Sequence, residues 1–72
     1  MDISAKIEAW RNARGVGIAE LARRVGVSTP TAWRWCRGKG NPTLANLGKL
    51  CAVLGVDLGV LLTIDPGAKG GR

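Results

Sequence analysis

The sequence predicts an all-α fold, a compact domain of five helices. Apolar residues recur at spacings of three, four and seven along most of the 72-residue chain, which is the period of amphipathic helices. A glycine or an Asp-Pro-Gly sequence follows each apolar stretch, where it would end a helix. No stretch alternates apolar and polar residues as a half-buried strand does. We expect residues 1–64 to form this domain and residues 65–72, which are rich in glycine and basic, to form a flexible tail.

The first helix is expected over residues 3–14, with Gly15 as its end. Its apolar stripe has the spacing i, i+4, i+7 and consists of Ile3, Ile7 and Trp10. We interpret Trp10 as a core residue. The second helix is expected to begin near Ile18 and to end before Gly26.

Residues 18–37 predict two short helices that cross closely. A bulky side chain at the crossing or at the turn would push such helices apart, so small residues belong at both places. Ala22 suits the crossing, and Gly26 suits the turn, where it also adopts positive φ at little cost. Five apolar residues have spacings that place them inside this corner: Leu21, Val25, Val27, Ala32 and Trp35.

The third helix is expected over residues 29–37 and has two faces. Ser28 is placed to cap it, Pro30 is tolerated in its first turn, and Gly38 ends it. The inward face consists of Ala32, Trp35 and Cys36. The outward stripe has no core to fill, and it consists of Pro30, Trp33, Arg34 and Arg37, with Thr29 beside it.

The last two helices complete the core. Thr43 opens or caps the fourth helix after the loop GKGNP, and Gly55 ends it. The inward face of this helix consists of Leu44, Leu47, Leu50, Cys51 and Leu54. Asp57 is placed to cap the last helix, expected over residues 58–64. The residues of this helix that we expect on the core are Leu58, Leu61 and Leu62.

Basic residues outnumber acidic ones by 11 to 5, which gives a formal net charge of +6. The imbalance is local, because residues 1–39 hold eight Lys and Arg against three Asp and Glu. No acidic residue lies between Glu20 and Asp57. A polyanionic partner explains this distribution better than solubility does, since mixed charges serve solubility equally well. The alternative is a basic surface without a partner.

The residue types argue against an enzyme, a metal site or a cofactor. The chain has no histidine, and its five carboxylates are scattered without a pattern for acid–base catalysis. Two cysteines without histidine are too few ligands for structural zinc. We expect Cys36 and Cys51 to be reduced, packed thiols, with a disulfide as the alternative. Neither a signal peptide nor an apolar run of ~20 residues is present, so we expect a cytoplasmic protein without membrane contact or small-molecule ligand.

The segment IAELARRVGVSTPTAWRWCR resembles the helix-turn-helix of the lambda repressor and Cro-like family, the XRE-type transcriptional regulators. The similarity continues in GVGIAELARRVGVS and GKGNPTLANLGKLCAVLGVDLGVLL, so it covers about residues 3–64. It implies that the third helix enters the major groove of double-stranded DNA. The chain departs from the family at Gly17-Ile18, where relatives commonly have a Ser-Gln pair that holds a phosphate, and at Cys36, where they have a glutamate that pairs with an arginine.

The resemblance implies roles for the residues of the outward stripe and the following loop. The residues implied to contact bases are Thr29, Pro30, Trp33 and Arg34, and those implied to contact phosphates are Arg37, Lys39 and Asn41. Arg34 is the strongest candidate, because its planar guanidinium matches the O6 and N7 acceptors of guanine. Trp33 has two interpretations: it contacts thymine methyl groups or sugars, or it covers the loop after Gly38. Many relatives have glutamine at the position of Thr29 or Pro30, so no adenine preference is implied.

Two classes of function follow. The first is a sequence-specific DNA-binding regulator, a small repressor of phage or mobile-element type that binds a two-fold operator as a homodimer, since one helix reads too few base pairs. The contact residues implied for the dimer are Leu58, Leu61, Leu62 and Ile64. The alternative is a monomer in which these residues are all core. The second class is a protein-binding module, such as an antitoxin or an adaptor subunit, with Trp33 as its anchor.

Overall fold

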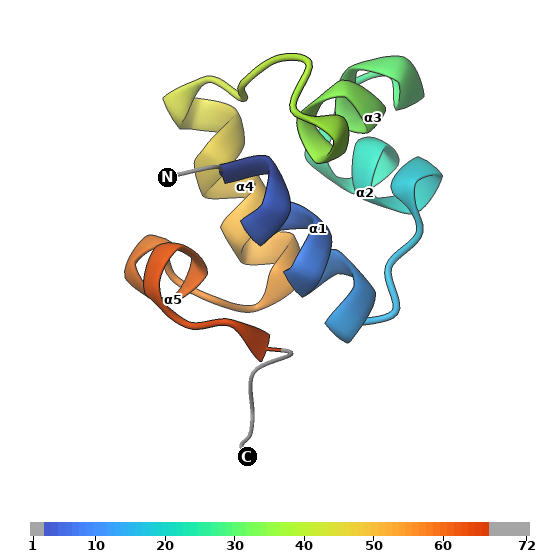
Figure 1. Ribbon diagram of the computed structural model, residues 1–72. Helices are drawn as coiled ribbons and strands as arrows, with labels where there is room; N and C mark the ends of the chain where they lie inside the picture. The colour runs from blue at the N-terminus through green and yellow to red at the C-terminus, as the bar shows by residue number, and fades with distance from the viewer. Residues whose placement is uncertain (1–2, 67–72) are drawn as a thin grey trace.

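The computed structural model describes residues 3–66, and this part of the chain contains five α-helices and no strand. The helices are α1 (Ile3–Ala13), α2 (Ile18–Val25), α3 (Thr29–Arg37), α4 (Leu44–Leu54) and α5 (Leu58–Thr63) (Figure 1). The predicted all-α fold is confirmed, and the first and last helices each end one residue earlier than expected. Most of the predicted flexible tail, residues 67–72, lies outside the described residues.

The helices pack around α1, which contacts both α3 and α5. The second helix lies against α3 and α4, and α4 also contacts α5 (Figure 1). As a result α3 and α5 lie on opposite sides of the domain, and one face of α3 has no helix over it. The pair α2 and α3 forms the predicted corner.

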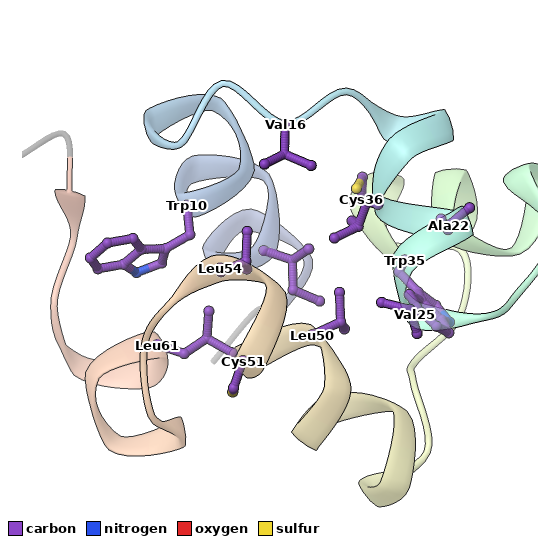
Figure 2. Packing of buried hydrophobic residues seen from close by; sticks show 13 residues of the cluster. Trp10, Val16, Ala22, Val25, Trp35, Cys36, Leu50, Cys51, Leu54 and Leu61 are labelled. Carbon is purple, nitrogen blue, oxygen red and sulfur yellow. The ribbon is translucent and has the colours of Figure 1, made fainter.

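The core draws side chains from all five helices and from the connection after α1. Its largest fully buried side chains are Ile7, Leu21, Leu50, Leu54 and Leu61. Two tryptophans, Trp10 and Trp35, are also buried, as expected for inward residues of α1 and α3. Figure 2 shows Trp10 and Leu61 at one end of the cluster and Trp35 with Val25 at the other.

Three predicted caps are confirmed at the N-termini of the last three helices. The side chains of Ser28, Thr43 and Asp57 accept hydrogen bonds from the backbone N–H groups three residues later, at 3.3, 3.1 and 2.8 Å. Each such bond satisfies a helix donor that would otherwise lack a partner, and its removal typically costs about 1 kcal/mol. By contrast, α2 begins after Gly17 without a side-chain cap.

The two small residues of the corner serve different purposes. Ala22 is buried, as a residue at a helix crossing should be. Gly26 has φ +94°, and its N–H donates to the Ala22 carbonyl in a left-handed cap of α2. No atom lies within 4 Å of the place where a Cβ on Gly26 would stand. Glycine is therefore required there for its backbone conformation, and the expectation of close steric approach at the turn is wrong.

Two leucines predicted to face the core are exposed instead. Leu44 is 79% exposed, and Leu58 is 38% exposed. Each is the first residue of its helix, and in Figure 1 the first turn of α4 reaches past the helices beside it. Helical spacing gives the direction of a side chain but not whether a neighbour covers it. In α5 only Leu61 is fully buried, while Val60 packs at the edge of the core.

Candidate nucleic-acid interface

The third helix has the two faces that its sequence predicts. Its buried residues are Ala32, Trp35 and Cys36. Its exposed residues are Thr29, Pro30, Trp33, Arg34 and Arg37. All four residues predicted to contact bases therefore share one exposed surface, which we call the outer face of α3. Trp33, in the middle of this face, is 43% exposed, and no other helix of residues 3–66 lies over it (Figure 1).

The cations of this surface keep their donors free. Within the described residues, neither Arg34 nor Lys39 forms a side-chain hydrogen bond or an ion pair. Arg37 lies over the ring of Trp33, with its guanidinium carbon 5.7 Å from the ring centroid, and has no other side-chain partner in this part of the chain. Each guanidinium carries five N–H donors and the ammonium of Lys39 carries three, so these groups can donate to an acceptor on another molecule.

The loop after α3 begins close to α1. Gly38 has φ +74°, and its Cβ position would lie 3.2 Å from the Oγ atom of the buried Ser4 in α1. The N–H of Lys39 donates to the Arg34 carbonyl at 2.9 Å, which closes the end of α3. Lys39 and Asn41, both predicted to contact phosphates, are exposed on this loop.

Two other arginines, Arg14 and Arg11, form contacts within the domain. Arg14 donates from Nε to the Leu54 carbonyl at 2.8 Å, and its guanidinium carbon lies 5.0 Å from the centroid of the Trp10 ring. The Trp10 indole donates to the Ile64 carbonyl at 3.1 Å. These contacts tie α1 to the ends of α4 and α5. Arg14 therefore stabilises the packing of these helices, a role that its position in the sequence did not predict.

Arg11 pairs with Glu8 one turn earlier in α1. Its Nη2 and Nε atoms donate to the two carboxylate oxygens at 2.6 and 3.2 Å, and Nη1 donates to the Val16 carbonyl at 3.0 Å. The hydrogen bonds from Arg11 lower the pKa of Glu8. The buried thiol of Cys36 on α3 lies near this pair.

Neither cysteine has the environment of a reactive thiol. Both are free and buried, as predicted. Burial, together with the nearby Glu8 carboxylate, raises the pKa of Cys36, and burial with the Asp57 charge raises that of Cys51. A raised pKa keeps a thiol protonated and weakly nucleophilic.

Other kinds of site are absent from the part of the chain that the structure describes. Residues 3–66 contain no group of three or more His, Cys, Asp or Glu that could hold a metal ion. No helix in this range is long and apolar enough to cross a membrane.

The chain is similar to known proteins over most of its length. A family model described as helix-turn-helix matches residues 7–61. An uncharacterized HTH-type transcriptional regulator of Haemophilus influenzae is 40% identical over 47 residues, which are 65% of this chain but 20% of that protein. The chain thus spans about one fifth of the length of this curated relative.

Solved structures share the fold. The clp gene regulator ClgR from Corynebacterium glutamicum superposes with a TM-score of 0.81 at 26% identity, over 85% of this chain and 65% of that one. SinR, a master regulator for biofilm formation solved in complex with DNA, superposes with a TM-score of 0.75 at 33% identity. That match covers 83% of this chain and 97% of the SinR chain.

Proposed function

This chain belongs to the helix-turn-helix family, and from that premise we propose that it is a sequence-specific, double-stranded DNA-binding transcriptional regulator. The outer face of α3 carries the proposal, because the guanidinium N–H donors of its Arg34 and Arg37 form no hydrogen bond within residues 3–66. An α-helix with its side chains fills a major groove about 12 Å wide. No other helix of the described residues lies over the outer face of α3. The similarity to SinR, a protein solved with DNA, supports the same conclusion.

The proposed contacts divide into base readers and phosphate binders. The base readers are Thr29, Pro30 and Arg34, with Trp33 beside them on the same face, and the phosphate binders are Arg37, Lys39 and Asn41. Arg34 reads a guanine through two parallel hydrogen bonds, since its guanidinium has no competing partner among the described residues. Lys39 and Asn41 lie on the loop that begins at Gly38, close to Ser4 of α1, and their phosphate contacts would fix the position of α3 on the DNA.

The protein acts as a homodimer on a two-fold operator and as a small repressor of phage or mobile-element type. A single helix of this length reads too few base pairs for useful specificity, which favours paired half-sites. Ile64, Leu58 and the half-buried Leu62 offer apolar surface for a second copy. Leu61 does not, because its side chain is fully buried in the core of its own chain.

Selection from a pool of random-sequence DNA duplexes tests the function directly. The purified protein is expected to retain a shared sequence that contains a two-fold repeat, and to bind it tighter than a scrambled duplex in a gel shift. The proposed dimer predicts two chains per duplex in sedimentation of the complex. Failure to bind any duplex at low salt would overturn the proposal and favour a protein-binding module anchored by Trp33.

A further inference from the structure

Trp33 and Arg37 form a stacked pair on the outer face of α3. They are four residues apart and so lie on neighbouring turns of one helix face. The guanidinium carbon of Arg37 is 5.7 Å from the centroid of the Trp33 ring, within the ~6 Å range of a cation–π contact. This contact is the one side-chain interaction of Arg37 among the described residues. Trp33 nevertheless stays 43% exposed.

The stack changes the position of the Arg37 charge along the surface of α3. Side chains in a helix lean toward its N-terminus, so the contact brings the guanidinium back by one turn, to the level of Trp33. Arg37 is the last residue of α3, and its charged group is thereby moved from the end of the helix toward its middle. Arg34 lies on the same surface, and like charges three residues apart repel by a few tenths of a kcal/mol on a helix. The electron-rich indole face offsets that repulsion.

We propose that Trp33 is a positioning residue for Arg37: the indole fixes the guanidinium on α3 and presents its N–H edge to a phosphate of DNA. Stacking occupies the flat face of a guanidinium and leaves the donors on its edge free. An arginine that is ordered before binding loses less side-chain entropy when it meets the phosphate. The proposal rests on the DNA-binding function proposed above and explains why a large aromatic residue stands on an exposed face.

A double-mutant cycle separates this role from a direct contact of Trp33 with DNA. The variants are Trp33→Leu, Arg37→Ala and the double variant, each titrated against the duplex that the parent selects. We expect Trp33→Leu to weaken binding about two- to fivefold per chain, the size of an exposed cation–π contact, and to have little further effect once Arg37 is alanine. Losses that multiply in the double variant would show that Trp33 acts by itself and would overturn the proposal.

The salt dependence provides a readout that a purely structural role would not move. The slope of log affinity against log salt counts neutralised phosphates. Trp33→Leu removes no charge, yet it should lower the slope toward that of Arg37→Ala, because the guanidinium no longer reaches its phosphate in a fixed position. Trp33→Tyr, which retains an aromatic face, should restore the slope. Lys49→Ala, an exposed cation on α4, is the matched charge control. An unchanged slope for Trp33→Leu would contradict the proposal.

A measurement without DNA distinguishes failure of the stack from failure of the proposed function. In the free protein, the ring current of Trp33 should shift the NMR signals of the Arg37 side chain, and Trp33→Leu should abolish that shift while thermal unfolding stays near that of the parent. Absence of the shift in the parent would overturn the stack alone. A parent that shows the shift but binds no duplex would overturn the DNA-binding function and, with it, the positioning role.

Discussion

Arg11 holds the carboxylate of Glu8 through two hydrogen bonds and reaches the Val16 carbonyl with a third. One side chain of α1 thereby joins the helix to the connection that leads into α2. The pair is mostly shielded from water, with the Arg11 side chain 12% exposed and that of Glu8 27% exposed. An ion pair of this kind contributes more than one on the open surface, such as Glu20 with Arg24.

Glu8→Gln should make folding less sensitive to acid. The pKa of Glu8 is lowered by the Arg11 hydrogen bonds, so the carboxylate stabilises the fold at neutral pH. That contribution is lost as the pH falls below about 4.5 and through the lowered value. In urea unfolding from about pH 7 to pH 3, the variant should be about 1 kcal/mol less stable at neutral pH and show a flatter acid limb. Glu20→Gln is the control, and identical acid limbs for parent and Glu8→Gln would refute the prediction.

Gly38→Ala should destabilise the domain more than Gly55→Ala. Both glycines have a positive φ near +74°, and a side chain in that region costs about 1–2 kcal/mol. A Cβ on Gly38 would also stand 3.2 Å from Ser4 Oγ, whereas the space around Gly55 is open. Thermal unfolding should show the larger fall for Gly38→Ala, at about 4–8 °C per kcal/mol. The difference between the two falls in melting temperature should be smaller when Ser4 is also replaced by alanine. Equal falls for the two glycine variants would contradict the prediction.

Ala22→Leu should cost about 1–3 kcal/mol by overpacking the junction of α2 with its neighbours. Ala22 is almost completely buried, so the added atoms have no free space to enter. Glu20→Ala, two residues earlier and exposed, should stay within about 0.5 kcal/mol of the parent. Thermal unfolding of both variants is the measurement. If Ala22→Leu melts like the parent, the core at this corner is looser than its burial indicates.

Arg34→Ala should weaken binding of the selected duplex by about 1–3 kcal/mol and relax preference at one base position. The reason is the removal of the two donors proposed to read guanine. Binding to a scrambled duplex should change little. Equal losses on both duplexes, measured by gel shift, would show that Arg34 contacts the backbone instead.

Lys39→Ala should reduce the salt dependence of binding without changing sequence preference. Lys39 has no side-chain partner among the described residues, and its proposed target is a phosphate. Removing one cation from a phosphate lowers the salt slope by about one. Affinity titrations at several salt concentrations measure this slope. A changed base preference with the slope intact would assign Lys39 to base readout.

The helices and their caps were predictable because their rules are local. Ser28, Thr43 and Asp57 stand directly before apolar stretches, and their side chains reach N–H groups only three residues away. The exposure of Leu44 was not predictable, since it depends on where the neighbouring helices end. The sequence likewise carries no local sign that Arg14 meets the Leu54 carbonyl, forty residues away.

The candidate site likewise has a part that the sequence predicted and a part that it did not. Periodicity alone separated the outer face of α3 from its core face, and the structure confirms that division. The stack of Arg37 on Trp33 was missed although the spacing i, i+4 is a usable signal for it. The Glu8–Arg11 pair, at i, i+3, could have been found by the same rule. The assignment of individual residues to bases and phosphates stays a prediction.

The hydrogen bond from Trp10 to the Ile64 carbonyl also fixes where the backbone after α5 lies on the domain. It anchors the backbone just after α5 to α1, on the side of the domain away from α3 (Figure 1). A fluorescent label attached at this anchored stretch would therefore lie on the opposite side of the domain from the outer face of α3. Since Leu58 and Ile64 also belong to the surface proposed for a second copy, such a label would report on dimer formation rather than on contact of α3 with DNA.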